Sequence, residues 1–227
     1  MFKLDNIQVK YKDITVLDNL SLELHKGSIF GVLGSNGAGK TTLFETIYQN
    51  TKYTGKILLN NSPINKKSIS YLESENYFYP YLSVKDILNL FTSKVNKTQI
   101  KRLIDFFNIP ENSVVETLSL GTQKKLAVIC NILLDREIYL FDEPFNGLDF
   151  ESVEKLYLIL KELQKKAKII LISSHVLETL TNCCDNIGLL KNGSFAEIYD
   201  KENFHLIRSF FSEKILQDWR DYNIENS

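Results

Sequence analysis

The sequence predicts an α/β fold: a mostly parallel sheet flanked by helices, with an antiparallel β part at the N-terminus and a small inserted helical lobe. Three observations predict this fold. The glycine-rich run Gly34 to Thr42, GSNGAGKTT, lies between an apolar strand pattern and a helical pattern. From Leu126 onward, strand and helix patterns alternate, which is typical of a parallel sheet covered on both faces. Between them, residues 73 to about 127 carry two helical patterns and no strand pattern.

Two strand patterns open the chain. The first has apolar side chains at Phe2, Leu4, Ile7 and Val9, and the second alternates strictly over residues 20–24. The apolar run at residues 29–33 then leads into the glycine loop. A helix is expected from this loop to about Tyr48. Short strands are expected next at residues 56–59 and 69–72.

The predicted lobe and the second half of the core follow. Val84 to Phe91 and Ile100 to Phe107 have helical spacing, and the second helix is expected to stop at Asn108-Ile109-Pro110. The elements expected after the lobe are a helix to Leu134, a strand at 138–141, a helix at 151–166, and strands at 169–172 and 187–190. We expect one domain, with its core at 1–72 and 128–200, the lobe at 73–127 and a helical tail at 201–227.

The tail carries an apolar stripe at roughly helical spacing: Phe204, Ile207, Phe211, Ile215 and Trp219. One interpretation is a terminal helix that docks on the core. The alternative is a helix that binds a partner or a second copy of the chain.

Composition excludes several classes of protein. The 227 residues are 44% hydrophobic, which suffices for a sizeable core. The formal net charge of −1, from 27 basic and 28 acidic residues, leaves no global basic field, so no nucleic acid partner is expected. No apolar run approaches the roughly 20 residues of a membrane helix, and the first residues lack a signal peptide's apolar core. A cytosolic protein is therefore expected, with Cys130, Cys183 and Cys184 reduced and mostly buried.

The glycine-rich run fits the pattern Gly-x-x-x-x-Gly-Lys-[Ser/Thr]. Glycines let successive backbone N–H groups turn toward a phosphate, and the start of the following helix adds positive potential. Lys40 is expected to reach the outer phosphates and the Thr41 hydroxyl to ligate Mg²⁺. The alternative is a flexible glycine turn with a solvated lysine. The residues expected to contact the nucleotide are Gly34, Ser35, Asn36, Gly37, Ala38, Gly39, Lys40, Thr41 and Thr42.

Acidic and imidazole side chains follow two of the later strand patterns. The apolar strand at 138–141 ends in Asp142 and Glu143. Asp142 is expected to hold Mg²⁺ together with Thr41, and Glu143 is expected to polarise a water against the γ-phosphate. The strand at 169–174 ends at His175, expected beside Glu143, where it can contact the γ-phosphate and the attacking water. The alternatives are ordinary strand-end caps or turn formers and a structural histidine.

In this order, the motifs resemble those of the nucleotide-binding subunits of ATP-binding cassette (ABC) transporters, and the resemblance covers nearly all of residues 1–200. Residues 34–42 resemble the family's Walker A motif and residues 138–144 its Walker B motif. FNGLD at 145–149 resembles the D-loop, with Asp149 at its aspartate, and His175 matches the switch histidine. Tyr11 matches the aromatic residue that stacks on adenine, the alternative being a strand aromatic packed in the core. The resemblance implies a P-loop NTPase core.

Two further motifs resemble the family's with changes. LSLGTQKK at 118–125 resembles the signature motif, which binds the γ-phosphate of ATP held by the opposite subunit. It keeps Ser119 and Gly121 and replaces a glycine by Leu120 and a glutamine by Thr122. The Q-loop glutamine, which reaches Mg²⁺ near the groove for the membrane partner, falls at Ser74. The residue that takes over the role of this glutamine is left open among Glu73, Ser74 and Glu75.

The resemblance implies a subunit that binds and hydrolyses ATP with Mg²⁺ and powers a transporter. Its expected partners are a polytopic membrane subunit and a second ATPase subunit, with a homodimer expected, on the cytoplasmic face of the membrane. The short lobe favours an exporter. One alternative is a soluble ABC ATPase that acts on a protein or nucleic-acid assembly, and another is a module that binds nucleotide without hydrolysing it. The transported substance is not encoded in such a subunit.

Overall fold

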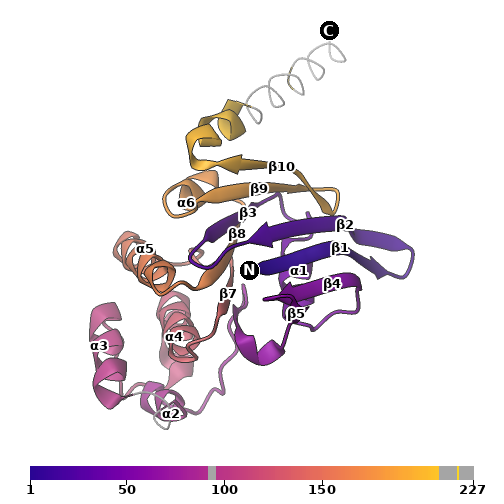
Figure 1. Cartoon of the computed structure of the whole chain (residues 1–227). Coiled ribbons are helices and arrows are strands. Elements are labelled where there is room, and N and C mark those ends of the chain that lie inside the picture. The colour runs from indigo at the N-terminus through magenta and orange to yellow at the C-terminus, as the bar shows by residue number, and fades with distance from the viewer. Residues whose placement is uncertain (92–95, 210–218, 220–227) are drawn as a thin grey trace.

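The computed structural model describes residues 1–91, 96–209 and 219 and contains two sheets (Figure 1). The smaller sheet is antiparallel, with strand order β2-β1-β4-β5. Its strands are β1 (Phe2–Tyr11), β2 (Ile14–Leu24), β4 (Thr54–Leu59) and β5 (Ser62–Pro63). This sheet is the predicted N-terminal antiparallel part.

The larger sheet has strand order β10-β9-β3-β8-β7-β6. Its strands are β3 (Ile29–Leu33), β6 (Ile69–Leu72), β7 (Ile138–Asp142), β8 (Ile169–Ser174), β9 (Asn186–Lys191) and β10 (Ser194–Asp200). All neighbours are parallel except β10, which pairs antiparallel with β9. The predicted fold class is therefore confirmed. Strand β10 was not predicted, because a register shift between Phe195 and Glu197 interrupts the alternation of its side chains.

Alternating side chains of the larger sheet divide the core into two layers. Ile138 and Leu140 of β7 pack on one face with helix α1 (Lys40–Ile47) and the smaller sheet. Tyr139 and Phe141 pack on the other face with residues from the remaining helices. Because successive residues of a strand point to opposite faces, β7 must be apolar at each of these positions. The uninterrupted apolar runs in the sequence thus reflect a sheet buried on both faces.

The remaining helices lie on one side of the larger sheet (Figure 1). They are α2 (Val84–Asn89), α3 (Lys97–Phe107), α4 (Leu120–Leu133), α5 (Phe150–Lys165) and α6 (Leu177–Thr181). Ser83 caps α2 in a capping box with Asp86, and α3 ends at Asn108 in the left-handed conformation. Helix α4 begins in the part predicted as the lobe and continues into the part predicted as the core.

The described part of the tail is attached to the core. Phe204 and Ile207 are buried in the larger core cluster, and Arg208 pairs with Glu178 of α6. Phe211 and Ile215 lie outside the described residues, so the interpretation of their stripe stays a prediction. Trp219 is exposed.

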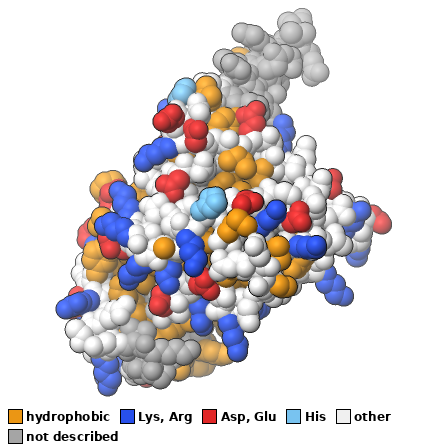
Figure 2. Space-filling view, viewed as in Figure 1, with side chains coloured by type: hydrophobic (Ala, Val, Ile, Leu, Met, Phe, Trp, Pro, Cys, Tyr) orange, Lys and Arg blue, Asp and Glu red, His pale blue; other side chains and the backbone are white. Residues whose placement is uncertain are grey.

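The charged side chains, the cysteines and the helix lengths bear on the predictions made from composition. On the face shown in Figure 2, basic and acidic side chains are interspersed rather than separated by sign. All three cysteines are free thiols, of which Cys183 and Cys184 are buried and Cys130 is partly exposed. Among the described residues, no helix is both long enough and apolar enough to cross a membrane.

The fold brings three strand ends to one edge of the larger sheet. Strands β3, β8 and β7 are adjacent and parallel, so their carboxyl ends lie side by side. The glycine loop follows β3, Glu143 follows β7 and His175 follows β8. Ligands of open parallel sheets bind beyond this edge of the strands.

Candidate nucleotide-binding and hydrolysis site

The glycine loop after β3 closes around the side chain of Lys40. Gly39 precedes α1 with φ +100°, and a Cβ atom on it would lie 3.3 Å from the Val16 carbonyl oxygen, so glycine suits this position on both counts. The Lys40 side chain is 7% exposed, and its Nζ donates to the carbonyl oxygens of Gly34 (2.8 Å) and Ser35 (3.3 Å). The alternative of a solvated lysine on a flexible turn is therefore wrong.

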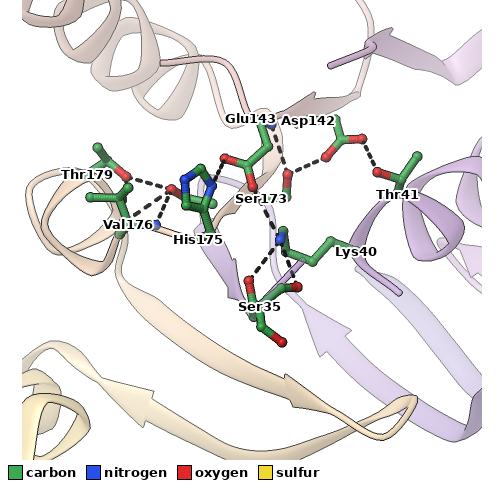
Figure 3. A network of polar contacts seen from close by, with 11 residues as sticks. Ser35, Lys40, Thr41, Asp142, Glu143, Ser173, His175, Val176 and Thr179 are labelled. Carbon is green, nitrogen blue, oxygen red and sulfur yellow. Dashed lines mark hydrogen bonds and ion pairs between the residues drawn. The ribbon is translucent and has the colours of Figure 1, made fainter. Parts of the chain in front are cut away.

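Asp142 at the end of β7 lies against the start of α1. Its buried carboxylate accepts a hydrogen bond from the Thr41 hydroxyl at 2.8 Å on Oδ2. Oδ1 accepts one from the Ser173 hydroxyl at 2.5 Å. The structure thus brings together Thr41 and Asp142, the two residues predicted as metal ligands (Figure 3).

Glu143 lies between Lys40 and His175 (Figure 3). One carboxylate oxygen is 3.3 Å from Lys40 Nζ, and the other is 3.0 Å from His175 Nδ1. Its φ of +47° is left-handed, a conformation that costs a non-glycine residue about 1 kcal/mol or more. The turn is held in part by its N–H, which donates to the Ser173 hydroxyl at 2.9 Å. The two predicted catalytic side chains therefore contact each other, and Glu143 also contacts the phosphate-loop lysine.

A hollow of about 360 Å³ opens beside these groups. Its lining is Val16, Asn36, Gly37, Gly39, Lys40, Thr41, Thr42, Ser74 and Glu143. Of the three candidates for the Q-loop position, Ser74 lines this hollow, whereas Glu73 and Glu75 line a separate groove of about 320 Å³. Ser35 and Ala38 line an adjoining hollow of about 640 Å³ that also contacts Asn36 and Gly37.

The signature and D-loop residues contact one another but do not line the 360 Å³ hollow. Ser119 caps α4, accepting the Thr122 N–H at 3.2 Å, and a Cβ on Gly121 would lie 2.7 Å from the Gly147 carbonyl oxygen. Asp149 caps α5 and pairs with Lys125 at 2.9 Å. The pKa of Asp149 lies well below its usual value. The hydrogen bond from Lys125 contributes most to this lowering, and those from the Ser152 N–H and hydroxyl contribute less.

Tyr11 at the end of β1 is half-exposed, so the alternative that it packs in the core is wrong. Its hydroxyl lies 3.3 Å from the Thr51 hydroxyl, beyond the end of α1. The ring does not line the 360 Å³ hollow, and stacking on adenine stays a prediction.

The residues at the hollow fit a magnesium ion that also binds the nucleotide. Among the described residues, no group of three or more His, Cys, Asp or Glu side chains is placed to hold a metal. Thr41 and Asp142 supply two hard oxygen donors beside the phosphate loop. Mg²⁺ typically takes one or two protein oxygens and completes its shell with phosphates and water. The donor set therefore suits Mg²⁺ bound with a nucleotide.

Comparison with known proteins identifies the family. A family model described as "ABC transporter" matches residues 17–146, more than half of the chain. The chain belongs to the ABC transporter family. An uncharacterized ABC transporter ATP-binding protein of Methanocaldococcus jannaschii is 34% identical over 200 residues, which cover 84% of this chain and 74% of the relative. The lantibiotic transport ATP-binding protein SrtF of Streptococcus pyogenes is 25% identical, covering 97% and 100%.

Solved structures show the same fold. A dimeric ATP-binding cassette in a post-hydrolysis state, bound to ADP and Pi, superposes with a TM-score of 0.79 at 21% identity, covering 88% of this chain and 99% of that one. The family match and the relatives described as ABC transporter ATP-binding proteins identify the chain as the ATPase subunit of an ABC transporter, in agreement with the motifs in its sequence.

The ABC subunit also contains a buried lysine that the sequence did not single out. Lys124 of α4 is 3% exposed, and its Nζ donates to the carbonyl oxygens of Glu73 (3.2 Å) and Ser74 (2.9 Å). Burial lowers its pKa to about 8, although the charges of Asp142 and Glu143 act in the opposite direction. A lysine in an amphipathic helix is ordinarily solvated, so no pattern in the sequence distinguishes Lys124 from its neighbour Lys125.

This lowered pKa predicts a pH-dependent stability. Between about pH 8 and pH 10.5, the unfolded chain keeps the proton on Lys124 whereas the folded protein has released it, so the free energy of unfolding rises with pH. In urea unfolding at pH 7.5 and 9.5, the wild type should gain roughly 1 to 2 kcal/mol relative to Lys124→Met. Lys165→Met removes an exposed lysine, and its free energy of unfolding should change with pH as that of the wild type does. Equal pH dependence in all three proteins would contradict the prediction.

Proposed function

We propose that this ABC subunit binds ATP with Mg²⁺ in the 360 Å³ hollow and powers an exporter through a separate membrane subunit. The observation that carries the proposal is the meeting of Lys40, Thr41, Asp142, Glu143 and His175 at one edge of the sheet. These groups supply the functions needed for phosphoryl transfer to water: a phosphate cradle, metal ligands and a base.

Each side chain has a role in this proposal that follows from its contacts. Lys40 and the start of α1 hold the phosphates, and Glu143 accepts the proton of the attacking water. His175, 3.0 Å from Glu143, orients that carboxylate and contacts the γ-phosphate. Mg²⁺ would be held by Thr41 and Asp142 and would offset negative charge on the phosphates. Ser74 takes the position nearest the phosphates in the Q-loop, in preference to Glu73 or Glu75.

A second copy of the subunit completes the site in this proposal. Ser119, Gly121 and Asp149 do not line the hollow of their own chain, which supports a role at the nucleotide of a partner. Two large apolar side chains beside these motifs, Leu120 and Phe150, are each 81% exposed, as expected of surfaces that a partner covers. The dimeric cassette with the same fold, bound to ADP and Pi, supports a dimer. In the homodimer that we propose, two ATP molecules are enclosed and Tyr11 stacks on adenine.

The membrane partner would dock at the 320 Å³ groove next to Ser74. Glu73, Glu75, Tyr77 and Phe78 contribute to its lining, and Tyr77 is 86% exposed. A groove with apolar rings and two carboxylates favours a partner helix that carries both apolar and basic side chains. We place the subunit on the cytoplasmic face of the membrane. The compact lobe and the resemblance to a lantibiotic transport protein favour export.

Capture of the partner tests the proposal. A Glu143→Gln subunit, incubated with ATP, is used to pull down proteins from detergent-solubilised host membranes. A stoichiometric polytopic membrane protein should elute, and it should be absent when the bait also carries Tyr77→Ala and Glu73→Lys in the groove. If the membrane protein still elutes with the groove variant, docking at this groove is refuted. If only soluble proteins elute, the membrane subunit is refuted and a soluble assembly becomes the better candidate.

A further inference from the structure

Ser173 lies at the centre of the site, although the sequence motifs assign it no function. It is the penultimate residue of β8 and is fully buried. In the parallel register of β7 and β8 it lies opposite Asp142, the last residue of β7. The register thus places its hydroxyl beside the carboxylate that we assign to the metal.

The Ser173 hydroxyl donates one hydrogen bond and accepts another. Ser173 Oγ donates to Asp142 Oδ1 at 2.5 Å and accepts from the Glu143 N–H at 2.9 Å. The other carboxylate oxygen of Asp142 accepts from Thr41 at 2.8 Å. Ser173 therefore links the side chain of one acidic residue to the backbone of the next, and Thr41 fixes the first from the opposite side (Figure 3).

The two hydrogen bonds act where ordinary strand pairing ends. The Glu143 N–H donates to a side chain rather than to a backbone carbonyl, just as the chain enters the left-handed conformation at φ +47°. A buried N–H and a buried carboxylate oxygen are costly to leave unpaired. Loss of the hydroxyl should therefore allow both the Asp142 carboxylate and the Glu143 turn to change position.

We propose that Ser173 is a positioning residue for ATP hydrolysis: its hydroxyl holds the Asp142 carboxylate in place for Mg²⁺ and fixes the turn that aims Glu143 at the attacking water. This inference rests on the proposed roles of Asp142 and Glu143. It goes beyond them because Ser173 does not itself line the hollow and acts only through Asp142 and Glu143.

Ser173→Ala in the full chain tests the inference by two measurements. Steady-state phosphate release should fall by about tenfold or more, which is the usual cost of removing a group that orients a metal ligand. Binding of a fluorescent ATP analogue (MANT-ATP) is measured with Mg²⁺ and with EDTA. The gain in affinity that Mg²⁺ provides should fall by a similar factor, while the affinity in EDTA stays within about twofold of wild type.

Three further variants separate positioning from simple structural support. Ser70→Ala removes another buried hydroxyl, in strand β6, which donates a hydrogen bond to Asn131 of α4. This variant should leave both measurements unchanged. Ser173→Thr keeps a hydroxyl and should restore most of the lost turnover and Mg²⁺ dependence. Ser173→Cys keeps the size with a weak donor and should behave as Ser173→Ala does, which preserves the test if the alanine variant fails to fold.

The outcomes are distinguishable from one another. The inference is overturned if Ser173→Ala hydrolyses ATP at the wild-type rate, or if it loses MANT-ATP affinity equally with and without Mg²⁺. It is likewise overturned if Ser173→Thr restores nothing although it folds as stably as wild type. If the wild type neither binds MANT-ATP nor releases phosphate, the proposed function fails first, and the effect of Ser173 is then irrelevant.

Discussion

A Glu143→Gln variant of this ABC subunit should bind ATP within a few-fold of wild type and hydrolyse it about a hundredfold more slowly or worse. The glutamine amide has nearly the size of the carboxylate and can still accept a hydrogen bond at its oxygen, but it does not take a proton from water. Glu143 is the carboxylate that lies between Lys40 (3.3 Å) and His175 (3.0 Å), so its loss removes the base without opening the phosphate loop. Phosphate release and MANT-ATP binding measure the two effects separately.

A matched control lies just before the same strand. Glu137 precedes the amino end of β7, whereas Glu143 follows its carboxyl end. It is half-exposed and pairs with Lys26 at 3.9 Å. Glu137→Gln changes one carboxylate to an amide far from the hollow and should leave hydrolysis unchanged. Turnover in Glu143→Gln within threefold of that control would refute the assignment of Glu143 as the base.

ATP should also make Glu143→Gln dimeric in size-exclusion chromatography, since the bound nucleotide persists.

The sequence was informative about the fold wherever burial produced a clear period. Strands β7 and β8 are apolar at nearly every position because both faces are covered, and such runs stand out between polar loops. Strand β10 is an edge strand that pairs with β9 alone in this sheet, and a register shift interrupts that pairing. Its side chains therefore follow no simple alternation. Its partner β9 was predicted from apolar residues alone.

The candidate site could be anticipated where a motif has a fixed spacing along the chain or where a side chain follows a clear strand pattern, as His175 does. Lys40 and Thr41 are adjacent in one loop, and Asp142 and Glu143 end one strand, so the sequence places each pair. Ser173 depends on the pairing of β7 with β8, because a shift of one residue would turn its hydroxyl to the other face. The choice of Ser74 over its two acidic neighbours depends on the path of a loop, which composition does not specify.

Lys40→Ala should lower the affinity for ATP by roughly ten- to a hundredfold, as expected when a charge-assisted hydrogen bond worth about 1.5–3 kcal/mol is lost. The buried ammonium group is the cation around which the loop folds, through the carbonyl oxygens of Gly34 and Ser35. The control is Lys26→Ala, which removes a half-exposed lysine beside Glu137. MANT-ATP titration measures both, and wild-type affinity in Lys40→Ala would contradict the phosphate-binding role.

The ion pair between Lys40 and Glu143 makes a sharper prediction for the double variant. In wild type, Glu143→Gln should change ATP affinity little, because Lys40 still neutralises the site. Without Lys40, the Glu143 carboxylate faces the phosphates with no cation on that side, and like charges repel. Glu143→Gln should therefore raise ATP affinity in the Lys40→Ala background, recovering part of what the first substitution lost. Residues in direct contact are expected to couple in this way. Strictly additive changes in binding free energy would show that the two side chains act on the nucleotide independently, and the contact between them would then have no part in ATP binding.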